Sequence, residues 1–226
     1  MKLSYLISCH NETDTLVRLL EKISDNKIET DEIVILDDFS DNPKTKEVLE
    51  SIRCCVLNTN VFNHHLDNNY SAHKNFGIEK CSGDWIFQLD ADERPSETLI
   101  FNIRDIIDTN KYIELIYISR INDYRGVTEN DAKHWGWRLT PSPFCENRLI
   151  VNWPDYQGRI FKKDYPRIHW DRKLHEKIEG HTEYAFLPAD EDLALYHDKT
   201  MAKQLETNLR YNKDFSVEDN KGHKVT

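Results

Sequence analysis

Two aspartates, one residue apart, stand where an apolar segment of this chain ends. Residues 83–93 read GDWIFQLDADE, so a strand-like run is followed directly by Asp90 and Asp92. Two carboxylates at this spacing can share one hard divalent cation, and a cation held in this way can bind a diphosphate. The same pattern also occurs in solvated turns and at helix N-caps. The aspartate pair therefore predicts a metal and diphosphate site only where neighbouring segments support it.

Polar residues also follow two earlier segments that are typical of buried strands. These are Asn11 and Glu12 after a strand over residues 2–8, and Asp37 and Asp38 after a strand over residues 31–36. Helical spacing of apolar residues separates the strands, and this order predicts an α/β fold, a mostly parallel sheet with helices on both faces. Ligands of such sheets bind beyond the carboxyl ends of the strands. We therefore expect the three polar clusters to line one nucleotide-sized pocket.

The remaining elements can be placed from apolar periodicity and turn residues. In the first half we expect a helix that carries Leu16 to Ile23 and is capped by Asn11 or Thr13, a helix over 45–52, a strand over 54–57, a loop over 58–69, a helix over 70–79, a strand over 85–89 and a helix over 96–108. In the second half we expect strands over 112–120, 159–161 and 193–197, a loop-rich aromatic stretch over 121–158 and a helix over 199–213.

The composition is typical of a globular chain with enough apolar material for a core. Of 226 residues, 38% are hydrophobic and 31% are charged, and the formal net charge is -10. This acidic balance argues against general nucleic-acid binding, which normally uses a basic face. We expect no transmembrane segment and no signal peptide, and five cysteines without CxxC spacing predict reduced thiols. The composition thus predicts a cytoplasmic protein, with a peripheral association with a membrane left open.

Six segments together resemble glycosyltransferase family 2. They read LISCHNE at 6–12, DEIVILDDFSD at 31–41, GDWIFQLDADE at 83–93, YQGRIF at 156–161, LHE at 174–176 and LYH at 195–197. Their order and spacing carry the resemblance, and the small lipopolysaccharide-core-type glucosyltransferases are the most similar subgroup. The resemblance implies a GT-A fold with a small acceptor-binding lobe. It also implies inverting, Mn²⁺- or Mg²⁺-dependent transfer of a hexose from a nucleotide diphosphate sugar, with UDP as the expected nucleotide, to an acceptor hydroxyl.

The resemblance also implies how the chain is divided. A single GT-A domain would span residues 1–215, with a nucleotide-sugar-binding half over 1–110 and an acceptor-binding half over 111–215, and a polar tail would follow over 216–226. One departure from the family is visible. The usual Asp-Asp-Gly-Ser is Asp-Asp-Phe-Ser here, so Phe39 takes the place of a glycine and removes backbone freedom beside the expected nucleobase pocket.

Positions that match the family motifs imply roles for the polar residues. Asp38 is expected to hydrogen-bond the nucleobase. The other expected donor-binding residues are Asn11, Glu12 and Asp37 around the nucleoside, Asp90 at the ribose, and Lys74 and Arg159 at the diphosphate. The expected metal ligands are Asp90, Asp92 and His197, a set that suits Mn²⁺ or Mg²⁺. Outside this family context, the same residues would be read as strand-end caps, a solvated lysine and a structural histidine.

Glu176 is the expected general base, because an inverting transfer needs a carboxylate within reach of the acceptor hydroxyl. The acidic cluster of Asp190, Glu191 and Asp192 is an alternative source of this base. Two other functions also remain: a nucleotidyltransferase that acts on a sugar phosphate, and a sugar-nucleotide-binding protein without catalysis. The acceptor is left open between a glycan, a lipid-linked glycan, a protein and a hydroxylated DNA base.

Overall fold

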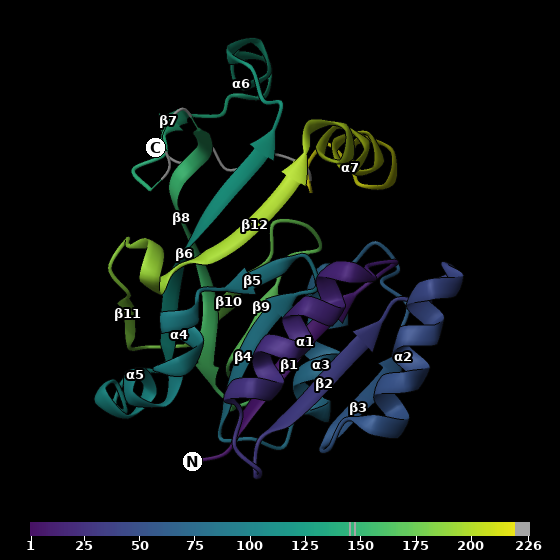
Figure 1. Cartoon of the computed structure of the whole chain (residues 1–226), viewed down its shortest axis with the longest axis vertical. Coiled ribbons are helices and arrows are strands. Elements are labelled where there is room, and N and C mark those ends of the chain that lie inside the picture. The colour runs from purple at the N-terminus through teal and green to yellow at the C-terminus, as the bar shows by residue number, and fades with distance from the viewer. Residues whose placement is uncertain (145, 147, 220–226) are drawn as a thin grey trace.

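The computed structural model describes residues 1–144, 146 and 148–219 of the chain. Its first half contains β1 (Leu3–Cys9), α1 (Asp14–Asn26), β2 (Glu32–Asp37), α2 (Pro43–Cys55), β3 (Thr59–Asn63), α3 (Tyr70–Lys80), β4 (Trp85–Asp90), β5 (Glu93–Pro95), α4 (Glu97–Phe101) and α5 (Ile103–Thr109). The second half contains β6 (Leu115–Arg125), α6 (Glu129–Trp135), β7 (Leu139–Pro141), β8 (Leu149–Lys162), β9 (His169–Asp171), β10 (Lys177–Glu179), β11 (Tyr184–Phe186), a 3-10 turn η1 (Glu191–Leu193), β12 (Leu195–Thr200) and α7 (Met201–Asp214). Figure 1 shows their arrangement.

One mixed sheet organises the molecule, with the strand order β3-β2-β1-β4-β8-β6-β12-β5. Strands β1 to β4 pair in parallel, whereas β8 runs antiparallel to both of its neighbours, β4 and β6. The parallel register places Ser8 of β1 opposite Asp90 of β4, and Cys9 opposite Asp37 of β2. The carboxyl ends of these three strands therefore meet at one edge of the sheet, as predicted.

Side chains of the first-half strands alternate between two cores, because successive residues of a strand point to opposite faces. One core lies against α1, α2, α4 and α5 and includes Tyr5 and Phe87, which are fully buried. The other core lies against α3 and the β9–β10 hairpin and includes Leu6. A Cβ at Gly77 of α3 would lie 2.7 Å from methyl carbons of Leu6 and Leu36. Helices and a hairpin thus cover both faces of the parallel part of the sheet.

Some predicted elements are wrong in position. The strand expected over 54–57 is wrong because α2 continues to Cys55, and β3 lies at Thr59–Asn63, inside the stretch expected to be a loop. This edge strand reads TNVFN and is half exposed, so its period-2 apolar signal is weak. The helix expected over 96–108 is divided at Asn102 into α4 and α5.

The predicted cap of α1 is also corrected. Thr13 occupies the N-cap position, but its side chain makes no capping hydrogen bond and its Oγ1 lies 2.7 Å from Oγ1 of Thr45. Asn11 accepts hydrogen bonds from the backbone N–H groups of Asp41 and Asn42, both at 2.9 Å. Asn11 therefore secures the loop between β2 and α2 instead of capping α1.

The second half is more regular than expected over residues 121–158. Strand β6 continues to Arg125, and β8 is already extended at Leu149. The far ends of β6, β8 and β12 extend beyond the parallel strands, where α6, β7 and α7 lie around them (Figure 1). Because β8 lies between β4 and β6, the two halves share one sheet. The division at residue 110 stays a prediction, and residues 220–226 of the expected tail lie outside the described part of the chain.

A search of the helices in the described residues finds none that is both long and apolar enough to cross a membrane.

Candidate functional site

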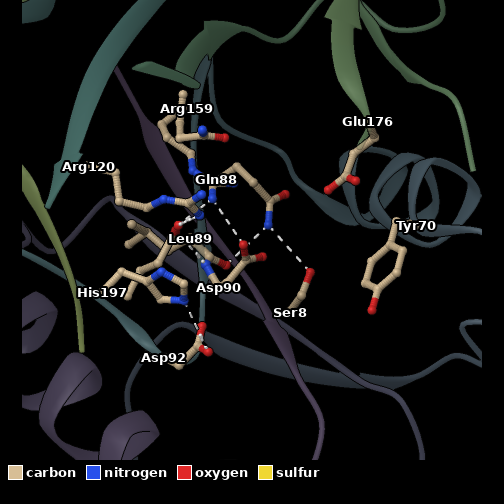
Figure 2. Close-up of polar contacts among 12 residues, drawn as sticks. Ser8, Tyr70, Gln88, Leu89, Asp90, Asp92, Arg120, Arg159, Glu176 and His197 are labelled. Carbon is tan, nitrogen blue, oxygen red and sulfur yellow. Dashed lines mark hydrogen bonds and ion pairs between the residues drawn. The ribbon is translucent and has the colours of Figure 1, made fainter. Parts of the chain in front are cut away.

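The expected donor-site residues gather at the carboxyl ends of β1, β2 and β4. Residues distant in sequence reach the same edge from α3, from β8, from β12 and from the loop between β9 and β10. Figure 2 shows Asp90 near the centre, with Asp92 and His197 on one side of it and Glu176 and Tyr70 on the other. Asp90 is therefore the reference point for the contacts of the other site residues.

Asp90 ends β4 and lies between two buried cations. Its Oδ2 is 3.0 Å from a guanidinium nitrogen of Arg159, and its Oδ1 is 3.5 Å from Nζ of Lys74. Glu93 accepts the backbone N–H of Asp90 at 3.2 Å, which fixes the loop that follows β4. Burial would raise the pKa of Asp90, but Lys74 and Arg159 outweigh it and hold the pKa well below its usual range. Asp90 is thus an ionised acceptor at neutral pH.

A chain of buried ion pairs continues from Asp90 into the second half. Arg159 is 2% exposed and also contacts Glu93 at 2.5 Å. Glu93 in turn pairs with Arg120 of β6 at 3.0 Å, and Arg120 pairs with Asp155 of β8 at 2.8 Å. Removal of one member would leave an uncompensated buried charge, which costs about 3–5 kcal/mol. This network fixes the β4–β5 loop against the central strands.

Glu176 lies in the short loop between β9 and β10 and reaches back toward Asp90. Its Oε1 is 2.6 Å from Nζ of Lys74, and its side chain is 15% exposed. Two other residues of this loop, Arg172 and His175, have positive φ angles of 75° and 54°. Non-glycine residues seldom adopt this conformation, and such strain is concentrated at functional sites. The loop therefore holds a carboxylate beside the donor edge in a locally strained backbone.

Asp92 and His197 lie on the other side of Asp90. Nε2 of His197 is 3.5 Å from Oδ2 of Asp92, and Nδ1 of His197 is 2.8 Å from Oδ1 of Asn122. An amide oxygen only accepts, so the imidazole proton is assigned to Nδ1 and the lone pair of Nε2 faces Asp92. Burial lowers the pKa of His197 and outweighs the opposing effect of Asp92, so the ring is neutral. Lys199 lies 3.1 Å from the same oxygen of Asp92.

This donor set fits a divalent cation with two protein ligands. In the ranges that the structure describes, no cluster of three or more His, Cys, Asp and Glu side chains is placed to hold a metal ion. Mg²⁺ is usually held by one or two carboxylates together with substrate phosphates. A cation here would have Asp92 and His197 as its protein ligands and would replace Lys199 at Oδ2 of Asp92, and this site stays a prediction. Asp90 is occupied by Lys74 and Arg159. Its role as a metal ligand stays a prediction.

Asp38 lies at the end of the site where the nucleobase is expected. Its Oδ1 accepts the backbone N–H of Leu66 at 2.9 Å, and the imidazoles of His10 and His65 lie 3.7 and 4.0 Å from its carboxylate. Phe39 has a φ angle of 46°, is 46% exposed and stacks on His65 with ring centroids 3.8 Å apart. The residue that replaces the usual glycine thus adopts the left-handed conformation itself and adds an aromatic wall beside Asp38.

The other expected nucleoside residues have structural partners. Asp37 is buried and accepts hydrogen bonds from the backbone and the hydroxyl of Ser40, the latter at 2.5 Å. Glu12 accepts a hydrogen bond from Thr15 at 2.8 Å and pairs with Lys203 of α7. Together with Asn11, these residues shape the loops around Asp38. Their direct contact with a nucleoside stays a prediction.

The competing acidic cluster lies in the turn before β12. Asp190 accepts the backbone N–H of Asp192 at 3.1 Å, and the backbone carbonyl of Asp192 accepts from Ser96 at 2.6 Å. Glu191 accepts from the hydroxyl of Tyr196 at 2.6 Å. These contacts serve the turn and its packing on α4. The choice between this cluster and Glu176 as the base stays a prediction.

Arg120, Asn122 and Lys199 were missed by the sequence reading. Each lies on a strand that was predicted at least in part, but its partners come from other segments far along the chain. The available signal was the placement of polar residues at alternate positions: Arg120 and Asn122 after an apolar run, and His197 and Lys199 in the last strand. That alternation indicates a polar face of the sheet, but it does not predict which residues of other segments these side chains contact.

The parallel strands end in carboxylates, β12 contributes a histidine and the β9–β10 hairpin contributes a glutamate. This arrangement is that of a protein of the GT-A class. The chain belongs to the family described as glycosyl transferase family 2, whose model matches residues 4–169. The family and the fold expected from the sequence are therefore confirmed.

Known proteins similar to this chain agree with that assignment. The amylovoran biosynthesis glycosyltransferase AmsB of Erwinia amylovora is 29% identical over 91 residues, which are 40% of this chain and 30% of AmsB. The structure of S. aureus TarS residues 1–349 in complex with UDP-GlcNAc has a TM-score of 0.58 at 18% identity, and it covers 88% of this chain and 59% of that one. The same part of TarS in complex with UDP has a TM-score of 0.57 at 17% identity, covering 91% of this chain and 63% of that one. This chain thus spans less than two thirds of the length of each.

Proposed function

We propose that this chain is an inverting hexosyltransferase that transfers a hexose from a nucleotide diphosphate sugar to an acceptor hydroxyl, with a divalent cation at Asp92 and His197. The observation that carries the proposal is the placement of Glu176 and of the Asp92–His197 pair on opposite sides of Asp90 (Figure 2). One side has a carboxylate available for a proton, and the other has ligands for a cation. The edge of the sheet between them is where such folds bind nucleotides.

The proposed reaction is a single displacement. The acceptor oxygen forms a bond to the anomeric carbon while the bond from that carbon to the diphosphate breaks, and Glu176 accepts the acceptor's proton. Asp92 and His197 would hold a divalent cation, which would stabilise the negative charge on the departing diphosphate. Asn122 orients the imidazole of His197 through Nδ1. Asp90 is kept ionised by its two cations and accepts hydrogen bonds from the ribose.

UDP is the proposed nucleotide. The family assignment supports a nucleotide-sugar donor, and the TarS structures of similar fold were solved with UDP-GlcNAc and with UDP. Asp38 has one oxygen bound to the loop and a side chain that is 23% exposed, which supports the proposal that it accepts the N3–H of a uracil. The acceptor proposed is a hydroxyl of a glycan or a lipid-linked glycan, and the similar protein AmsB is named as a glycosyltransferase of amylovoran biosynthesis.

A thermal-shift panel tests this function. We expect UDP and UDP-sugars to raise the melting temperature in the presence of MnCl₂, and we expect Asp92→Ala to lose most of that shift, because the cation loses a ligand. Asp105→Asn on α5, away from the strand ends, is the matched control and should behave like the wild type. Stabilisation by nucleoside triphosphates alone would contradict the proposal and favour a nucleotidyltransferase. UDP binding without release of UDP from any UDP-sugar would favour a binding protein without catalysis.

A further inference from the structure

We infer that Lys74 is a positioning residue that connects the general base Glu176 to Asp90, and that it does not serve as a ligand of the diphosphate. This inference rests on the proposed function, because it assigns to Lys74 an effect on Glu176 in that reaction. Lys74 lies in the middle of α3, and its side chain is 3% exposed. Three segments that are far apart in the sequence meet at its ammonium group.

Three groups surround the ammonium nitrogen of Lys74. Nζ donates a hydrogen bond to Oε1 of Glu176 at 2.6 Å, lies 3.5 Å from Oδ1 of Asp90 in an ion pair, and lies 4.6 Å from the centroid of the Trp170 ring. An ammonium group has three donors and no acceptor, and two carboxylates and an aromatic face all suit its charge. A diphosphate would have to displace one of these partners to reach it.

Burial of the Lys74 ammonium group carries a cost in free energy of folding. Transfer of an ammonium group from water into the protein costs several kcal/mol, and an apolar residue of similar size would often be as stable or more so. Although burial lowers the pKa of Lys74, Asp90 and Glu176 more than compensate and raise it, so the group stays charged. A charged lysine retained at the contact between α3, β4 and the hairpin points to a requirement for the ion pairs themselves.

The backbone of the loop between β9 and β10 is held by the Tyr70 N–H, which donates to the carbonyl of Lys173 at 2.9 Å, and by buried Leu174. The Glu176 side chain needs an anchor of its own. In the described part of the chain, Glu176 has Lys74 as its one ion-pair and hydrogen-bond partner. The neighbouring His175 and Arg172 have left-handed backbone conformations that store strain. Without Lys74, we expect the Glu176 carboxylate to move away from the position it holds in this structure. A displacement of a reacting group by about 1 Å can lower a rate about 100-fold. Lys74 thus sets the distance from the base to the donor edge.

Lys74→Met tests the inference, with Lys80→Met as the matched control. Lys80 lies on the same helix but is exposed, and its Nζ lies 4.5 Å from the ring centroid of Phe76 and 5.8 Å from that of Phe62. We expect Lys74→Met to bind UDP within about threefold of the wild type, while its release of UDP from UDP-glucose or UDP-GlcNAc falls about 10- to 100-fold. A loss of more than tenfold in UDP affinity would overturn the inference, because it would make Lys74 a diphosphate ligand.

A double variant separates positioning from a general structural effect. If Lys74 acts through Glu176, then Lys74→Met combined with Glu176→Gln should release UDP no more slowly than Glu176→Gln alone. Multiplicative losses would overturn the inference. Lys74→Arg keeps a cation between the carboxylates and should recover part of the rate if it folds.

Hydrogen exchange gives a readout that does not need activity. Amides of residues 172–176 should exchange faster in Lys74→Met, or in Lys74→Gln if the first variant does not fold, and should be unchanged in Lys80→Met. Equal protection of this loop in all variants would overturn the inference. A wild-type protein that neither binds UDP nor releases it from a UDP-sugar would instead count against the proposed function, so the two failures are distinguishable.

Discussion

At the residue scale, the site is made of charges that compensate one another. Glu176, Lys74, Asp90, Arg159, Glu93, Arg120 and Asp155 follow one another in contact, with opposite signs alternating. Each carboxylate is paired with a cation from another element, so these charges are compensated before a ligand arrives. Preorganised charge of this kind is the main contribution that a protein makes to a transfer in which a diphosphate departs.

The stability of the protein should depend on pH through His73, next to this network. His73 is 3% exposed, and burial lowers its pKa to about 4, with a further lowering by His64. The unfolded chain, with a pKa of about 6.5, binds more protons between pH 6.5 and 4, so stability falls as the pH decreases through this range. We expect a loss of about 2 kcal/mol from this residue at pH 5, measured by urea unfolding at pH 7.5 and 5.

His73→Gln should remove that part of the pH dependence. The exposed His134 on α6 provides the control, because His134→Gln should leave the slope of stability against pH as it is in the wild type. Equal slopes for the wild type and His73→Gln would contradict the prediction.

At the scale of elements, the β9–β10 hairpin is the least predictable part of the site. Its strands have three residues each, and the base lies in the loop that joins them. Asn75 of α3 attaches the hairpin through two hydrogen bonds with the backbone of Trp170, both 2.8 Å long. Gly180 lies at the end of the hairpin with a φ angle of 83°, where an added Cβ would lie 1.8 Å from the carbonyl oxygen of Arg167.

Gly180→Ala should therefore destabilise the protein strongly. The substitution combines the cost of a left-handed alanine, about 1–2 kcal/mol, with a backbone clash that only movement of the hairpin can relieve. Gly126→Ala is the matched control, because Gly126 has a similar φ angle of 88° and an added Cβ would meet nothing within 4 Å. Urea unfolding should show a larger loss for position 180 by at least about 2 kcal/mol. Equal losses of unfolding free energy at both positions would contradict the prediction, because they would show that the contact of the new Cβ with Arg167 has no cost.

The parallel half of the fold and the polar residues at its strand ends could be predicted from the sequence. The apolar runs of β1, β2 and β4 end abruptly in polar pairs, and parallel pairing brings such ends to one edge. The pairing of Lys74 with Glu176 could not be predicted, because 102 residues separate them and neither has a local signal for the other. The edge strand β3 was not predicted because its sequence, TNVFN, has too weak an alternation of apolar and polar residues.

At the scale of the whole molecule, the two halves cannot be separated without cutting the sheet. Strand β8 pairs with β4 of the first half and with β6 of the second. Lys74 and Arg159 also connect the halves through buried ion pairs. The halves therefore differ in the role expected of them but share one core.

Unfolding should accordingly be a single cooperative transition. Far-ultraviolet circular dichroism and tryptophan fluorescence should give the same urea midpoint, because Trp85 lies in the first half and the other four tryptophans lie in the second. Two separate midpoints, or a stable folded fragment of residues 1–110, would contradict this expectation and support two independent domains.

The place of β8 in the sheet also has a consequence for synthesis of the protein. While the ribosome adds residues 91–150, β4 has already been made, but its partner, residues 160–162, has not. During that interval the nascent sheet presents the unpaired N–H and C=O groups of β4 along one side, and such an edge pairs readily with other chains. Emergence of β8 closes it. The later half of the chain thus covers an edge of the earlier half that would otherwise be open to pairing with other chains.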